Sequence, residues 1–232
     1  QIKQTTILTL KTQTIMRKLF SLFMALLATT SLWAEDFSVG GIYYNYLDGN
    51  NVEVTYRGSK YDSYSNEYSG SVEIPAIVNV YGTTYNVTSI GEYAFRGCSS
   101  LTSITIPESI TSIEDYAFYK CSSLTFINVT ENSKLISIGN YAFYECDSLT
   151  SIAIPESVTS IGVNAFKGCS GELTVNCNIP SSPSDESGAF YKSEFTKVTI
   201  GEGVTSIGDC DIIKKYSMFL KGRHSCEKKS RI

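Results

Sequence analysis

The chain has 232 residues, of which 42% are hydrophobic and 18% are charged, and its formal net charge is −4. That length and composition suit one elongated domain with a continuous apolar core. The charge is unevenly distributed, because residues 35–210 hold 8 Lys and Arg against 21 Asp and Glu, whereas the remainder holds 11 basic and 2 acidic residues. A body with a net charge of −13 repels phosphate backbones and anionic membrane surfaces, so nucleic acid is not an expected partner.

The first 34 residues divide into two segments. Residues 1–15 begin with Gln and match nothing downstream, so we interpret them as non-native upstream sequence before a start at Met16. The alternative is a genuine longer N-terminus with an internal hydrophobic segment. Residues 16–34 have a basic start, the apolar run 19–28 and a short stretch that ends at Ala34, which is the layout of a secretory signal peptide. The apolar run is too short to span a bilayer comfortably, so no transmembrane span is expected in the mature chain.

Residues 35–71 are rich in Tyr, Asn, Gly and Ser. Segments 41–46 and 52–56 are predicted to be two strands of a hairpin, because Asp-Gly lies between two runs that contain aromatic residues. Residues 59–71 are polar and are predicted to form a loop. A second hairpin is predicted from residues 77–90, with its turn at Gly82-Thr83-Thr84, and it leads into the first repeat.

Residues 72–210 repeat the same pattern. The pair Ala-Phe recurs at 94–95, 117–118, 142–143, 165–166 and 189–190, so the period is 23 to 25 residues. Each unit has the form L-x-x-I-x-I-P-x-x-V/I-x-x-I-G-x-x-A-F-x-x-C-x-x. Self-similarity at this period predicts a solenoid of stacked coils. Because the open end of such a stack exposes hydrophobic side chains and unpaired strand groups, the hairpin within residues 35–71 is predicted to form an N-terminal cap.

One unit is too small to bury its apolar residues alone. Ile104 and Ile106 alternate with polar residues, which predicts a short strand with one buried face, and Pro107 ends it because proline cannot donate a ladder hydrogen bond. Residues 111–113 are predicted to be a second extended piece. The apolar residues of segment 117–121 have a spacing that predicts a short helical turn. Equivalent residues should therefore stack as ladders, such as Ile104, Ile127 and Ile152, or Phe118, Phe143 and Phe166.

The pattern L-x-x-I-x-I-P…I-G-x-x-A-F-x-x-C resembles the BspA-like, bacterial surface-antigen type of leucine-rich repeat over about residues 72–210. The preceding residues 37–71 also resemble the N-terminal segment of such proteins. The resemblance implies a β-rich, right-handed leucine-rich-repeat solenoid. It also implies a secreted or surface-attached bacterial protein that acts in adhesion to host or neighbouring cells.

The repeat pattern weakens toward the C-terminus. Residues 172–194 keep the strand alternation, but residues 180–184 are predicted to form a loop in place of the second extended piece. Another unit begins at Phe195, and the register is lost near Cys210. Residues 211–232 are basic and match no earlier unit. We interpret this loss as a frameshift or truncation of the reading frame, and a genuine basic amphipathic tail that caps the solenoid is the alternative.

Four of the seven cysteines occupy the same position in successive units; they are Cys98, Cys121, Cys146 and Cys169. In a stack their Cα atoms would lie about 5 Å apart, but their Cβ vectors would run parallel instead of toward each other. We therefore expect free, buried thiols that act as small hydrophobic side chains. Disulfide pairing is the alternative, because secreted chains ordinarily favour it.

No catalytic, metal or cofactor site is expected in the repeat body. There is no C-x-x-C pair that could bind zinc. The single histidine, His224, lies in the basic tail, so the repeat body has no histidine for a Cys-His or Ser-His-Asp catalytic group. Glu108 and Glu156 recur just past the strands, and we interpret them as solvated turn residues; an acidic column for cations or sugars is the alternative. Carbohydrate processing is a further alternative, but glycosidase carboxylates flank a cleft, whereas these glutamates recur along a surface.

Two repeated surfaces are candidate binding sites. The first is the strand face, whose outward hydroxyl side chains include Ser103, Thr105 and Ser151. The second is a tyrosine stripe made of Tyr93, Tyr116, Tyr119, Tyr141 and Tyr144. Exposed aromatic side chains make good protein contacts, but these tyrosines could instead pack on one another and shield the turns. We favour the strand face, because solenoids commonly offer a continuous surface to ligands.

We interpret the chain as a non-enzymatic, adhesin-like binding module at the bacterial surface or in secreted form. Its expected partner is a protein or glycan on host or neighbouring cells. The alternative function is a structural spacer or scaffold whose activity lies in a missing C-terminal region.

Overall fold

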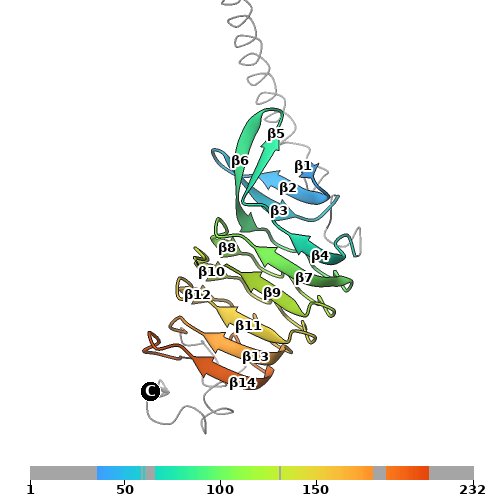
Figure 1. Ribbon diagram of the computed structural model, residues 1–232. Helices are drawn as coiled ribbons and strands as arrows, with labels where there is room; N and C mark the ends of the chain where they lie inside the picture. Colours follow the sequence, from blue (N-terminus) through green and yellow to red (C-terminus); the bar gives the residue numbers. More distant parts are fainter. Residues whose placement is uncertain (1–35, 59, 61–65, 131, 180–186, 209–232) are drawn as a thin grey trace, which may run out of the picture.

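The computed structural model describes residues 36–58, 60, 66–130, 132–179 and 187–208. This part of the chain is a β-solenoid in which successive coils stack along one axis (Figure 1). The solenoid predicted from the period is therefore confirmed. The predicted signal peptide, the loop at residues 180–184 and the basic tail lie outside the described residues.

One sheet contains the strand with which each coil begins. Its strands, in spatial order, are β4 (Gly70–Glu73), β7 (Leu101–Ile106), β9 (Phe126–Val129), β11 (Ser151–Ile154), β13 (Ser170–Val175) and β14 (Glu194–Ile200). All neighbouring pairs are parallel, because each coil returns the chain to the side where it started. In this register Ile104 lies beside Ile127, and Ile152 lies beside Leu173. The predicted isoleucine ladder is therefore present.

A second sheet contains the short strand of each coil. Its parallel part runs through β6 (Thr83–Ile90), β8 (Ser112–Ile113), β10 (Ser137–Ile138) and β12 (Ser160–Ile161). Strand β8 confirms the second extended piece predicted at residues 111–113. At the N-terminal end, β3 (Asn51–Thr55) pairs in parallel with β6, and β2 (Ile42–Tyr46) and β1 (Phe37–Val39) follow in antiparallel order.

Both predicted hairpins are present. Strands β2 and β3 form the first, and β5 (Ile77–Val80) pairs with β6 to form the second. The turn of the second hairpin consists of Tyr81 and Gly82 instead of the predicted residues 82–84. These two residues have φ angles of +48° and +79°, which both lie in the left-handed region that two-residue hairpin turns of type I′ require.

The helical turn predicted around the Ala-Phe pair is wrong, because no helix forms there. In the coil that begins with β7, the amide groups of Tyr116, Phe118 and Lys120 donate to carbonyl oxygens of the next coil at 2.9, 2.7 and 2.8 Å. The amides of Ala117 and Tyr119, which lie between them, each donate to a carbonyl oxygen three residues earlier in the same coil. Tyr116 and Lys120 have φ angles of +57° and +59°, which interrupt any helical run. The segment is a chain of tight turns whose hydrogen bonds alternate between their own coil and the next.

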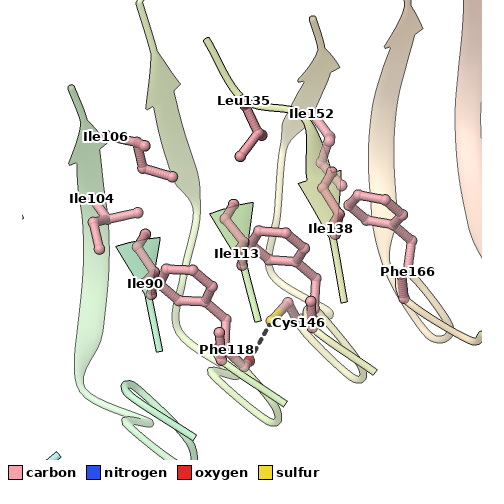
Figure 2. Packing of buried hydrophobic residues seen from close by; sticks show 14 of the residues in the cluster. Ile90, Ile104, Ile106, Ile113, Phe118, Leu135, Ile138, Cys146, Ile152 and Phe166 are labelled. Atoms are coloured by element: carbon pink, nitrogen blue, oxygen red, sulfur yellow. Dashed lines mark hydrogen bonds between the residues drawn. The ribbon is translucent and has the colours of Figure 1, made fainter. Parts of the chain in front are cut away.

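The interior of the coils is filled by columns of equivalent side chains. The rings of Phe95, Phe118, Phe143, Phe166 and Phe190 stack with centroids 4.9 to 5.2 Å apart and with 4 to 6° between their planes. Figure 2 shows the rings of Phe118 and Phe166 beside isoleucines of both sheets. Because each ring contacts the coils on both sides, burial depends on the stack and not on any single coil.

The four ladder cysteines are free and buried, as predicted, and so is Cys177. Three of the thiols have a further role. The Sγ atoms of Cys121, Cys146 and Cys169 each lie 3.0 Å from the backbone oxygen of a phenylalanine one coil earlier. Figure 2 shows this contact between Cys146 and Phe118. These thiols therefore donate hydrogen bonds between coils as well as filling space.

The last described unit continues the solenoid. Phe195, Val198, Val204 and Ile207 are buried, and β14 pairs with β13 along its length. Ile207 forms a parallel bridge with Ile179. The unit that begins at Phe195 is therefore in register as far as Gly208.

Candidate functional site

The outer surface of the first sheet presents two rows of side chains. One row contains, in strand order, Ser71, Ser103, Phe126, Ser151, Glu172 and Lys197. The second contains Glu73, Thr105, Asn128, Ala153, Thr174 and Thr199. None of these side chains is buried. We call these two rows the strand face; it brings together Ser103, Thr105 and Ser151, the three residues predicted for it.

Phe126 stands out on the strand face. Its residue is 48% exposed, and its strand neighbours are Ser103 on one side and Ser151 on the other. The remaining side chains of the face are small, polar or charged, and the charged pair Glu172 and Lys197 forms an ion pair of 3.0 Å. Sequence reasoning missed Phe126, although an aromatic residue where the adjacent units have serine was a usable signal.

The tyrosine stripe consists of two columns. Tyr93, Tyr116 and Tyr141 stack with centroids 5.2 and 5.0 Å apart, and Tyr119 stacks on Tyr144 at 4.8 Å. The columns touch each other, because Tyr116 lies 5.6 Å from Tyr119. All five rings are partly buried. The five predicted tyrosines are thus brought together, and their faces pack mainly on one another.

Cations cover the remaining ring faces of the second column. The Arg96 guanidinium lies 5.5 Å from the Tyr119 ring, and the Lys167 ammonium lies 5.3 Å from the rings of both Tyr144 and Tyr191. Burial and the neighbouring Tyr141 raise the pKa of Tyr116. These side chains therefore form a ladder that stacking and cation–π contacts stabilise between coils.

A third feature, which was not predicted, is a polar hollow of about 870 Å³ beside the turns of successive coils. Its lining comprises Asn132, Ser133, residues 155–157, residues 176–178 and residues 201–203. Glu156 therefore lines this hollow, together with Glu202, whereas Glu108 lies exposed in an earlier coil. Among the described residues, no group of three His, Cys, Asp or Glu side chains is placed to hold a metal ion.

The comparisons with known proteins agree with this geometry. A sequence model described as the BspA type leucine-rich repeat region matches residues 82–185 in six copies. The chain belongs to the BspA-type leucine-rich repeat family. Among curated proteins, the chain has no match. Within its described residues, no helix is long and apolar enough to cross a membrane.

Three solved structures are similar to this BspA-type chain. A leucine-rich repeat protein from Bacteroides capillosus is 33% identical, over 57% of this chain and 91% of that chain, with a TM-score of 0.47. A leucine-rich cell surface protein from Faecalibacterium prausnitzii is 28% identical, over 74% of this chain and 44% of that chain, with a TM-score of 0.56. A leucine-rich repeat protein from Bacteroides ovatus is 24% identical, over 83% and 58% of the two chains, with a TM-score of 0.44. The chain therefore spans less than two thirds of the length of the last two.

Family and fold together describe a repeat protein with an extended, regular surface. In BspA-type coils as in other solenoids, each unit adds a similar strip to that surface, which suits the binding of macromolecules.

Proposed function

We propose that the chain is a secreted or cell-surface binding module, adhesin-like, which contacts macromolecules on host or neighbouring cells through the strand face. Three observations support the location and role: the BspA-type family, the cell-surface description of the Faecalibacterium prausnitzii protein, and the signal-peptide layout of residues 16–34. A non-enzymatic role accords with a surface made of repeats.

The observation that carries the choice of surface is the exposed ring of Phe126. A phenylalanine that is 48% exposed on an otherwise small and polar sheet keeps an apolar side chain in water. Aromatic side chains are enriched at the centres of protein interfaces, where a few buried residues supply most of the binding free energy. The flanking hydroxyl groups of Ser103 and Ser151 would form the polar surroundings of such a contact.

The strand face also has the regularity that a repeated contact needs. Ser103 and Ser151 occupy the same row in different coils, and Thr105 lies in the second row, so a partner that spans several coils meets similar groups on each. Affinity per coil should be modest and should rise with the number of coils engaged.

The test is binding of the full chain to a panel of purified extracellular-matrix proteins and glycans. Phe126→Ser gives this coil the residue that its neighbours have, and it should weaken binding about tenfold or more. Ile136→Thr is the matched control, because Ile136 is 51% exposed away from the strand face and the adjacent units have Thr111 and Thr159 at that position. The control should bind like the wild type.

Two further variants decide between the surfaces. Thr105→Lys combined with Ser151→Lys should abolish binding, because two long cations then stand on the strand face. Tyr116→Ala combined with Tyr141→Ala tests the tyrosine stripe, and if only this variant abolishes binding, the choice of the strand face is wrong. If the wild type binds no matrix protein, glycan or cell surface, the spacer or scaffold function replaces the adhesin-like one.

A further inference from the structure

The second hairpin extends past the sheet to which it belongs. Strand β6 pairs with β3 only from the Asn86–Asn51 rung onward. The rungs Val78–Tyr85, Asn79–Thr84 and Val80–Thr83 of the β5–β6 hairpin lie beyond that point. Figure 1 shows the hairpin projecting at the N-terminal end of the solenoid. The turn residues Tyr81 and Gly82 therefore stand at the tip of a projection.

Tyr81 is an unusual residue for this tip. Type I′ turns favour Asn-Gly, because both central residues need a positive φ angle. The φ angle of Tyr81 is +48°, in a region that costs free energy for a bulky side chain. Tyr81 is also 93% exposed. Strained residues that the core does not require tend to occur where a protein makes contacts.

Further aromatic side chains lie beside the tip. Tyr46 contacts Tyr85 at 5.1 Å between ring centroids and Phe37 at 4.8 Å. Burial, followed by Tyr85, Asp36 and Tyr81, raises the pKa of Tyr46 to about 12. The Asp36 carboxylate accepts a hydrogen bond from the Tyr46 amide at 2.7 Å, so a negative charge lies beside these rings. The hairpin that carries Tyr81 therefore adjoins, through Tyr85, an aromatic cluster with a carboxylate beside it.

Acidic residues outnumber basic ones at this end of the molecule, where Arg57 is the one basic residue of segment 36–58. Residues 36–56 contain Asp36, Asp48 and Glu53 but neither Lys nor Arg, and residues 74–90 contain no charged residue. Tyrosine rings attract ammonium and guanidinium groups, and nearby carboxylates add to that attraction. The net charge of −13 on residues 35–210 would also speed the approach of a basic partner and slow that of an acidic one.

We propose that the tip of the β5–β6 hairpin is a second interaction surface, which docks the basic surface of a partner protein with Tyr81 as its anchor. The surface is separate from the strand face and its partner is defined by charge. The proposal therefore does not depend on the function of Phe126.

Binding of an oligo-arginine peptide to the full chain tests this inference, with an oligo-glutamate peptide of equal length as the comparison. Tyr81→Asn supplies the residue that the turn favours, so this variant should melt at the wild-type temperature or above it. Its affinity for oligo-arginine should fall about two- to fivefold, which is the loss expected for an exposed cation–π contact. Tyr81→Trp keeps an aromatic face and should retain the wild-type affinity.

Phe126→Ser is the control for location, and it should leave oligo-arginine binding unchanged even if it abolishes binding to matrix proteins. Wild-type affinity for oligo-arginine in Tyr81→Asn would overturn the proposal, as would equal loss in Tyr81→Asn and Tyr81→Trp. Equal binding of oligo-glutamate by the wild type would overturn the assignment of a basic partner.

Discussion

The ring of Phe143 lies parallel to the ring of Phe166, with 5.2 Å between centroids and 6° between planes. On its other side, Phe143 contacts Phe118 in the same way at 5.0 Å. A side chain in the middle of this column therefore supports the coil before it and the coil after it.

Phe143→Ala should lower the free energy of unfolding by about 3–5 kcal/mol, because it removes a large buried ring and leaves a cavity between two coils. Phe190→Ala should cost less, since Phe190 stacks on Phe166 on one side but meets Phe195 edge-on at 6.1 Å on the other. Urea unfolding of the two variants measures the difference. Equal shifts of the urea midpoint would count against a column in which interior positions matter most.

Gly162→Ala should destabilise the protein by about 1–3 kcal/mol, because an added Cβ would fall on the backbone of Gly139 and Asn140 one coil earlier. Gly203→Ala is the matched control, since a Cβ there meets no atom within 4 Å. Thermal unfolding should show a lower melting temperature for the first variant and little change for the second. A Gly162→Ala protein as stable as the wild type would mean that the coils are less closely spaced than the structure indicates.

Stability should fall as the pH rises above about 9. Burial raises the pKa of the Cys98 thiol from 9.0 to about 11, so the folded state keeps a proton that the unfolded state loses. The contribution of this thiol is complete below about pH 9 and is lost progressively toward about pH 11. Cys98→Ala should make the decline shallower by at most about 1.4 kcal/mol per pH unit. The free energy of unfolding in urea between these pH values measures both slopes, and identical slopes would contradict the prediction.

Asn140→Ala should destabilise the protein by about 1–3 kcal/mol. The Asn140 side chain donates to Asp115 at 3.0 Å and accepts from the Val163 amide at 2.8 Å, so it links three coils. Hydrogen exchange of the Val163 amide should become faster in this variant. Asn128→Ala, on the exposed strand face, is the control and should leave that amide unchanged; faster exchange in both variants would indicate general loosening instead of a lost bond.

The stacking of coils could be predicted from the sequence because burial of Ile104 or Phe118 depends only on the period and on alternation. The conformation around Ala117 could not, since the same apolar spacing fits a helical turn and a series of tight turns. The deciding factor was where the amides of Tyr116 and Phe118 find acceptors, and those acceptors belong to the next coil. Side-chain patterns carry no information about that choice.

The candidate surfaces were predictable to different degrees. The outward position of Ser103 and Ser151 follows from strand alternation, and so does that of Phe126 once its unit is aligned with theirs. Tyr81 was harder to place, because Tyr-Gly is not a typical pair for a two-residue hairpin turn and the sequence favoured a turn one residue later. The extent to which stacking buries the tyrosines depends on the distance between coils, which no single unit specifies.

The alternation of turn hydrogen bonds between their own coil and the next has a mechanical consequence. The bonds that join one coil to the next are oriented along the axis of the stack, from Tyr116 to Asn140 and from Phe118 to Ala142. A pulling force applied between the two ends of the solenoid loads the junctions between coils in series, so the weakest junction opens before the others. Each coil of 23 to 25 residues that peels away releases about 80 Å of extended chain. Under tension the molecule would therefore lengthen stepwise, one coil at a time, while the remaining coils stay folded.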